Sequence, residues 1–243
     1  MKKPRPVKSA AEIMHGMEFP QQFAPSVAGP TTTPPDSAPE TWEQGKARQA
    51  QERGMKRFVE LCPPLYRQTD PARLPARGKL AEVMAWKYGP NGLLLVGPTG
   101  TGKTRCAWLL MRRLILEDCR RVTYFDGIGW GIEVAKEYGQ PETTGQWLDR
   151  VCRAEILFLD DLFKAKMTEA QEQALYGVFD RRAAWQRPTI ATMNSTGDMI
   201  LARMTETGRA DRGEALLRRM REFCEVVTFG LAAAALPATV ALP

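Results

Sequence analysis

Short continuous apolar runs alternate with longer stretches of helical periodicity along most of the chain. The run at 156–159 is continuously apolar, as expected for a strand that is buried on both faces of a parallel sheet. The runs predict five strands, at residues 93–96, 122–125, 156–159, 189–193 and 226–229. Strands that alternate with helices are typical of an α/β fold with a mainly parallel sheet.

Apolar residues recur at helical spacing between these strands. Ala107, Leu110, Met111 and Leu114 lie at i, i+3, i+4 and i+7, and they predict an amphipathic helix that begins near Thr104. Further helices are predicted at residues 41–61, 77–88, 132–138, 143–152, 168–185 and 213–224. The helices at 143 and 168 begin with a T-x-x-Q pattern, which is typical of a capping box. The segment 195–212 has no clear period.

The first 40 residues differ in composition from the rest, because eight of the 18 prolines fall there. We expect a largely disordered, flexible arm, in which the less polar residues 10–19 are either a docking peptide or part of a plain tail. Residues 41–75 are predicted as a helical linker with a proline-interrupted lead-in segment, 76–230 as the α/β domain, and 231–243 as an apolar tail.

The formal net charge of +6 and the pI of about 9.2 permit a polyanionic partner without requiring one. Five scattered cysteines and a single histidine argue against a disulfide framework and a cysteine–histidine zinc site. The basic start of the chain is not followed by an apolar segment of the signal-peptide type. The apolar residues 231–243 are too few to span a bilayer. We therefore expect a cytoplasmic protein without membrane contact.

A glycine-rich motif connects the strand predicted at 93–96 to the helix that follows it. The motif fits G-x-x-x-x-G-K-[ST], and its context of strand, loop and helix is that of a phosphate-binding loop. Lys103 is expected to reach the β- and γ-phosphates of a nucleotide, and the Thr104 hydroxyl to bind Mg²⁺. The residues expected to bind nucleotide are Gly97, Pro98, Thr99, Gly100, Thr101, Gly102, Lys103, Thr104 and Arg105.

Two carboxylates, Asp160 and Asp161, follow the apolar run at 156–159. Ligands of open parallel sheets bind at the carboxyl ends of the strands, so both carboxylates are expected beside the nucleotide. Asp160 is predicted to hold Mg²⁺ through water. Asp161 is predicted to polarise the attacking water, a role that a glutamate fills in many ATPases. The alternative is a strand-end turn in which the aspartates cap the next element.

Asn194 ends the strand predicted at 189–193, and its amide is expected to orient the attacking water, although an asparagine after a strand is also a common turn former. Its position resembles sensor 1 of AAA+ ATPases. Arg219 lies on the last predicted helix, where an arginine of AAA+ assemblies contacts the γ-phosphate in the neighbouring subunit. We expect Arg219 to have this catalytic role, with Arg218 as the competing choice. The alternative is a solvated basic helix.

With these features in order, the chain resembles the DnaC/IstB branch of AAA+ ATPases, which comprises bacterial and phage helicase loaders and transposition helper proteins. The resemblance runs from about residue 62 to 229. It is most specific in the pattern D-R-R at 180–182, R-P-T-I at 187–190 and Asn194. The segments C-P-P-L-Y at 62–66 and L-R-R-M at 217–220 also resemble this branch.

The resemblance implies a five-stranded parallel sheet of order 5-1-4-3-2, with ATP and Mg²⁺ bound at the subunit interfaces of a self-assembled oligomer. It also implies an insertion, residues 126–141, that lines a path for single-stranded DNA. Trp130 and Lys136 are suited there to base stacking and phosphate contact, or else are ordinary packing and surface residues. We expect a reduced or absent helical lid after Phe229, and no arginine beyond Arg221 to serve as sensor 2.

The first functional hypothesis is an ATPase that loads a replicative hexameric helicase onto single-stranded DNA, with ATP binding and hydrolysis switching its assembly. Hydrolysis is expected to be slow and to be stimulated by DNA or by the partner. The second is an IstB-like transposition helper that acts with a transposase on duplex DNA. A small-molecule P-loop kinase, against which Asp160, Asp161 and Asn194 argue, and a structural DNA-binding module with a vestigial ATP site are further alternatives.

Overall fold

The structure, a computed structural model, describes residues 41–75, 77–138, 141–164, 166–206 and 208–230. The arm expected at residues 1–40 and the tail expected at 231–243 lie outside this part of the chain. From Trp42 on, the described residues belong to one compact unit.

All five predicted strands form, and they pair in parallel as one sheet. They are β1 (Gly92–Val96), β2 (Val122–Asp126), β3 (Ile156–Leu162), β4 (Thr189–Met193) and β5 (Cys224–Thr228). The order across the sheet is β2-β3-β4-β1-β5, which confirms the expected order read from the opposite edge. Because β4 lies between β1 and β3, the loops that follow these three strands are neighbours.

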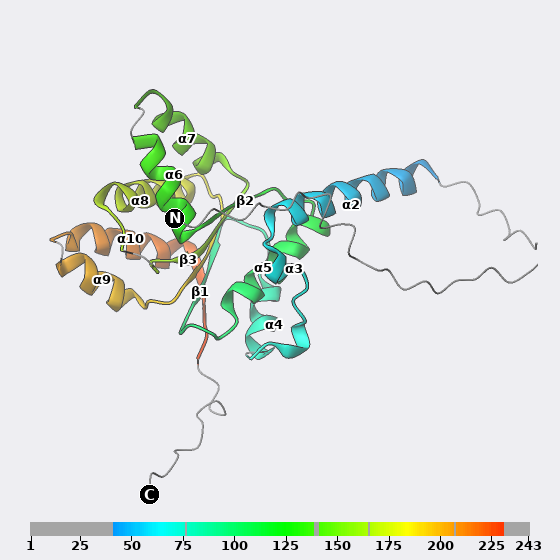
Figure 1. Ribbon diagram of the computed structural model, residues 1–243, viewed down its shortest axis with the longest axis horizontal. Coiled ribbons are helices and arrows are strands. Elements are labelled where there is room, and N and C mark those ends of the chain that lie inside the picture. The colour runs from blue at the N-terminus through cyan, green and yellow to red at the C-terminus, as the bar shows by residue number, and fades with distance from the viewer. Residues whose placement is uncertain (1–40, 76, 139–140, 165, 207, 231–243) are drawn as a thin grey trace, which may run out of the picture. The chain divides into compact units, whose positions relative to one another are not determined.

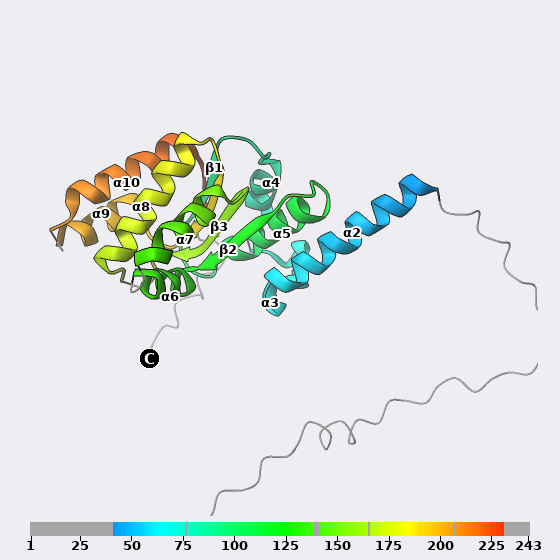
Figure 2. The same cartoon turned by 90° about the horizontal axis from the view of Figure 1, so that it is seen from above.

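Helices cover both faces of the sheet (Figures 1 and 2). One face carries α2 (Trp42–Leu61), α3 (Pro64–Arg67), α4 (Arg77–Ala85) and α5 (Lys103–Leu116), with a short 3-10 turn, η1 (Pro71–Arg73). The other face carries α6 (Gly127–Tyr138), α7 (Pro141–Arg153), α8 (Glu169–Ala184), α9 (Gly197–Glu206) and α10 (Ala210–Phe223). The layering is that of an α/β fold with a doubly covered parallel sheet.

Each face of the sheet has its own aromatic-rich core. On one face, the buried ring of Trp108 on α5 packs edge-on against Phe158 of β3, with 5.2 Å between centroids. On the other, Trp130 of α6 packs against Trp147 of α7 at 5.4 Å, in the core that also contains Leu159 of β3. Successive residues of β3 thus enter opposite cores, as the period of a strand requires. This packing anchors β3, which carries the two aspartates.

The region after β2 differs most from the expectation. Helix α6 begins at Gly127, well before the predicted start at residue 132. Two of its glycines allow close packing against neighbouring elements. A Cβ at Gly127 would lie 2.7 Å from the carbonyl oxygen of Asp161, and one at Gly131 would lie 2.8 Å from Nε2 of Gln171. Asp126 Oδ1 accepts a hydrogen bond from Gly129 N at 2.5 Å and caps the first turn.

Smaller differences have local causes. Helix α9 was not predicted, because its buried apolar residues Ile200 and Met204 make a stripe of a single turn. Helix α7 begins at Pro141, so the expected cap at Thr143 is wrong, whereas the capping box at the start of α8 is present. Within the described residues, no helix is long and apolar enough to cross a membrane.

Candidate nucleotide-binding site

Three loops meet at the carboxyl edge of the sheet, after β1, β4 and β3. A pocket of about 570 Å³ opens there, within the size range of small-molecule sites. Of the residues expected to bind nucleotide, Thr99, Gly100, Gly102, Lys103, Thr104 and Arg105 line this pocket. Asp161 and Asn194 also line it, so the structure brings the predicted phosphate loop and the predicted water-activating groups together.

The glycine-rich loop needs glycine at two positions for steric reasons. Gly97 has a φ of 153°, and a Cβ there would lie 2.1 Å from the carbonyl oxygen of Phe229, which follows β5. Gly102 has a φ of 92°, in the left-handed region, and leads directly into α5. The close approach of the Phe229 backbone therefore helps to fix the shape of the loop.

The ammonium group of Lys103 lies within the loop. Its Nζ donates to Gly97 O and to Pro98 O, each at 2.7 Å. The residue is only 5% exposed, and burial lowers the pKa of Lys103 although Asp161 and Asp160 act in the opposite direction. A phosphate oxygen is a stronger partner for an ammonium than a neutral carbonyl. Lys103 is therefore suited to bind a phosphate that enters the loop.

Asp160 is the centre of a buried hydrogen-bonded array. Its Oδ1 accepts from Thr104 Oγ1 at 2.9 Å and from Thr192 Oγ1 at 2.5 Å. Thr192 Oγ1 in turn accepts from the backbone N–H of Asp161 at 2.9 Å. Burial raises the pKa of Asp160, and the two hydroxyl donors oppose that effect. A hydroxyl and a carboxylate side by side are oxygen ligands of the kind that Mg²⁺ prefers, so Thr104 and Asp160 fit the predicted ion.

Asp161 has a φ of 54°, which is unusual for a residue other than glycine, at the point where the register between β3 and β4 shifts. Its Oδ1 lies 3.4 Å from Asn194 Nδ2, and its Oδ2 lies 2.7 Å from Lys164 Nζ. Asp161 and Asn194 are therefore neighbours. Lys164 is a further member of this group that the sequence did not indicate.

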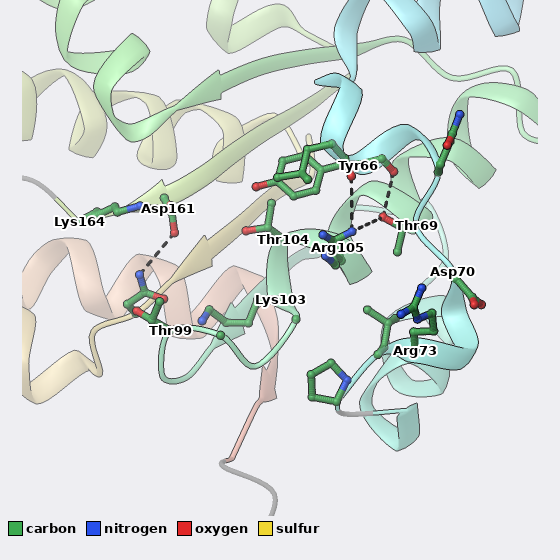
Figure 3. A pocket seen from close by; sticks show the side chains of 17 residues that line it. Tyr66, Thr69, Asp70, Arg73, Thr99, Lys103, Thr104, Arg105, Asp161 and Lys164 are labelled. Carbon is green, nitrogen blue, oxygen red and sulfur yellow. Dashed lines mark hydrogen bonds and ion pairs between the residues drawn. The ribbon is translucent and has the colours of Figure 1, made fainter. Parts of the chain in front are cut away.

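The segment 62–75 contributes the other end of the pocket (Figure 3). Arg105 Nη1 on α5 lies 3.3 Å from Thr69 Oγ1, which ties the helix to this segment. Arg73 lies at the same end, and Asp161 lies at the opposite end (Figure 3). The pocket thus extends from a phosphate-binding end beside the loop to a second end that has space for the remainder of a nucleotide.

Arg219 is on α10 and is not among the residues that line this pocket. Its Nε donates to Asp180 Oδ1 at 2.8 Å, and its Nη1 lies 3.3 Å from Glu222 Oε2. The adjacent Arg218 is exposed, and both arginines line a groove beside α9 and α10. Neither arginine lines the site of its own chain, so a role in a neighbouring subunit stays a prediction.

The expectation that Trp130 stacks on DNA bases is wrong. Its side chain is fully buried and packs against Phe125, with 5.9 Å between centroids, and against Trp147. Base stacking requires an accessible ring. Lys136, on the same helix, is exposed and forms an ion pair with Glu133 at 2.7 Å. Of the two residues, only Lys136 is accessible to DNA.

Two residues of the site, Thr192 and Lys164, were not predicted from the sequence. Thr192 is a polar residue inside an apolar strand, two positions before Asn194, and this pattern could have identified it. Lys164 follows β3 in a loop, and only its spacing of three residues from Asp161 hints at a contact. The backbone turn at Asp161, which no sequence pattern indicates, creates that contact.

A family model described as IstB-like ATP binding protein matches residues 69–233, which is more than half of the chain. The comparison with curated proteins gave no match. Among solved structures, the crystal structure of the DnaC helicase loader has 20% sequence identity and a TM-score of 0.50, over 72% of this chain and 99% of that chain.

AMPPCP-bound DnaA from Aquifex aeolicus has 17% identity and a TM-score of 0.52, over 70% of this chain and 51% of that chain. At such identities the structural matches establish the fold alone, and that fold is the AAA+ P-loop domain that the resemblance implied, with the implied strand order. Together with the phosphate-binding loop and the family match, it follows that the chain belongs to the IstB-like ATP-binding proteins and is a DnaC/IstB-type AAA+ ATPase.

Proposed function

We propose that this protein loads a replicative hexameric DNA helicase onto single-stranded DNA, with ATP binding and hydrolysis switching its assembly. ATP binding and hydrolysis are supported by the match to the IstB-like family and, above all, by one structural observation. Lys103, Asp160 and Asp161 lie together at one edge of the sheet. The loader part is supported by the fold shared with the DnaC helicase loader along almost that entire chain.

Each residue has one task in the proposed hydrolysis. Lys103 binds the β- and γ-phosphates, and the neighbouring Thr104 and Asp160 would hold Mg²⁺, Asp160 through water. The ion, when bound, neutralises charge on the phosphates. Asp161 accepts a proton from the attacking water, whose oxygen bonds to the γ-phosphorus as the bond to the β–γ bridging oxygen breaks, and the amide of Asn194, beside Asp161, orients that water. The products are ADP and phosphate, which no longer hold the assembly together.

The proposed assembly is an oligomer with ATP at its subunit interfaces. Arg219 then contacts the γ-phosphate of the neighbouring subunit, and the ion pair with Asp180 orients its guanidinium beforehand. The proposed single-stranded DNA contact relies on exposed cations such as Lys136. Binding through phosphates releases counterions, so DNA affinity should fall steeply with salt. A salt-independent affinity would exclude this mode of binding.

A second candidate function is that of a transposition helper that acts with a transposase on duplex DNA. It is favoured by the description of the matching family, which is IstB-like. Both functions use the same ATP site, so the chemistry of the pocket does not separate them. The identity of the partner does.

Affinity capture from lysate of the source organism tests the proposal. The full-length protein is used with Mg²⁺ and ATP, and the Lys103→Ala variant serves as the matched control that lacks the phosphate-binding ammonium. We expect recovery of a hexameric replicative helicase with the wild-type protein and much less with Lys103→Ala. Recovery of a transposase in place of a helicase would replace the loader proposal by the helper function.

A further inference from the structure

Lys164 lies two residues after the end of β3, in a tightly turned loop. Asp161 and Phe163, on either side of the last strand residue, both have positive φ values, of 54° and 63°. Such values are costly for side chains other than glycine and occur where the surroundings impose them. The two turns bring Lys164 Nζ to 2.7 Å from Asp161 Oδ2.

The ion pair affects the group that is proposed to activate water. The second carboxylate oxygen of Asp161 faces the amide of Asn194 at 3.4 Å, so both oxygens already have hydrogen-bond donors. The hydrogen bond to Asp161 raises the pKa of Lys164 further above neutrality, so the group that Asp161 holds is an ammonium. A carboxylate that is paired with an ammonium is a weaker base, so it accepts a proton from water less readily.

Lys164 also has the freedom to leave this partner. Its side chain is 61% exposed, whereas that of Asp161 is 31% exposed. Lys164 lines the same pocket as Lys103, and Figure 3 shows Lys164 beside Asp161 at the phosphate-binding end. A terminal phosphate carries more charge and more acceptor oxygens than a carboxylate. It therefore competes with Asp161 for the ammonium of Lys164.

We propose that Lys164 exchanges Asp161 for the terminal phosphate of a bound nucleoside triphosphate, and so discriminates triphosphate from diphosphate. The same exchange frees a carboxylate oxygen of Asp161 for the attacking water. This inference rests on the proposed ATP site. It adds a specificity-determining residue that contacts the γ-phosphate from the same chain, independently of any arginine from a neighbouring subunit.

Nucleotide affinities test the exchange. Binding of AMPPCP, which is not hydrolysed, and of ADP is measured by calorimetry with Mg²⁺ on the full-length protein. Lys164→Ala should weaken AMPPCP binding about tenfold, as for loss of a charge-assisted hydrogen bond, and should change ADP binding less than about twofold. Lys164→Arg should restore most of the preference. Lys166→Ala removes an equal charge from a groove lined by Gly127 and Phe163, so it should leave both affinities unchanged.

A double-mutant cycle then tests the competition itself. Asp161→Asn should strengthen AMPPCP binding, because Lys164 no longer has a carboxylate partner, and this gain should shrink at least threefold in the Lys164→Ala background. Equal gains in both backgrounds, or equal losses of AMPPCP and ADP affinity in Lys164→Ala, would overturn the exchange while leaving the ATP site intact. Failure of the wild-type protein to bind either nucleotide would overturn the proposed function as well.

Discussion

Arg182 of α8 is a fully buried cation that the described part of the chain holds with neutral oxygens. Its guanidinium donates to the carbonyl oxygens of Val151, Cys152, Ala154 and Pro188 and to Thr189 Oγ1, at distances of 2.6 to 3.1 Å. Burial lowers the pKa of Arg182 to about 10. The side chain thereby joins the end of α7 to the starts of β3, which contains Asp161, and of β4, which Asn194 follows.

Arg182→Ala should lower the free energy of unfolding by about 3–4 kcal/mol, because several buried carbonyl groups lose their donor together. Urea unfolding monitored by tryptophan fluorescence measures the change. Arg181→Ala is the matched control: that side chain is 56% exposed and lies 3.8 Å from Asp149, so its loss should cost less than about 1 kcal/mol. Equal effects of the two substitutions would remove the structural role assigned to Arg182.

Thr192 links the two aspartates of the site. Thr192→Val keeps the shape of the side chain but leaves Asp160 Oδ1 with one donor fewer and the Asp161 N–H without this acceptor. We expect a loss of about 1–3 kcal/mol in unfolding free energy and a lower rate of ATP hydrolysis. Thr192→Ser retains the hydroxyl and should retain most of both properties. A Val variant as active as the Ser variant would show that the hydroxyl is dispensable.

The site residues that were predicted from the sequence are those that a motif, or a position at the end of an apolar run, indicated. Lys103, Asp161 and Asn194 were found in this way, and all three line one pocket. Arg182 was noted only through a resemblance, although it lies at i+7 from Leu175 on the buried stripe of α8. An arginine within the apolar stripe of a helix indicates that its guanidinium is held by a buried network of hydrogen bonds. The base-stacking prediction for Trp130 was wrong because aromatic side chains occur both in protein cores and at nucleic-acid contacts. The residue type alone does not distinguish these two roles.

At the scale of elements, α6 has an unusual dependence on glycine. The first residue of the helix, Gly127, packs so closely on β3 that a Cβ would lie 2.7 Å from the carbonyl oxygen of Asp161. Glycine ordinarily weakens helices, so a helix that begins at Gly127 was not predicted from the sequence. Close packing requires glycine here, and the position of Asp161 depends on it.

Gly127→Ala should destabilise the protein by about 1–3 kcal/mol and should slow ATP hydrolysis, since either α6 or the backbone of Asp161 must move. Gly145→Ala, in α7, is the control: a Cβ there meets nothing within 4 Å, and the substitution should stabilise by up to about 1 kcal/mol. Thermal unfolding and phosphate release on both variants measure these effects. Stabilisation by Gly127→Ala would contradict the packing described here.

The helices and strands that could be predicted from the sequence are those with a simple pattern of buried residues. The inner strands β1, β3 and β4 are buried on both faces and appear in the sequence as mainly apolar runs, so their positions were predicted within a few residues. The extension of β3 through Leu162 was not, because it depends on pairing around a shifted register. Helix α9 gave too short an apolar stripe to be recognised.

At the scale of the whole molecule, the proposed assembly makes each ATP site depend on two subunits. Arg219→Ala should bind ATP normally and lose hydrolysis by a factor on the order of 10³, the magnitude typical of arginine fingers. Mixing it with Lys103→Ala should restore part of the activity, because one subunit then supplies Lys103 and its neighbour supplies Arg219. Arg218→Ala, treated identically, shows whether the adjacent arginine has this role instead. No recovery in either mixture would exclude a finger in trans from this helix.

The most direct test of the proposed loading activity is the transfer of the helicase from the source organism onto closed circular single-stranded DNA. A closed circle has no end over which a ring can thread, so retention requires that the ring be opened. With the wild-type protein, Mg²⁺ and ATP, we expect helicase to co-purify with the circle well above the level found without the protein. Lys103→Ala should return it to that background. Equal retention with wild-type protein, with Lys103→Ala and with neither would contradict ATP-dependent loading.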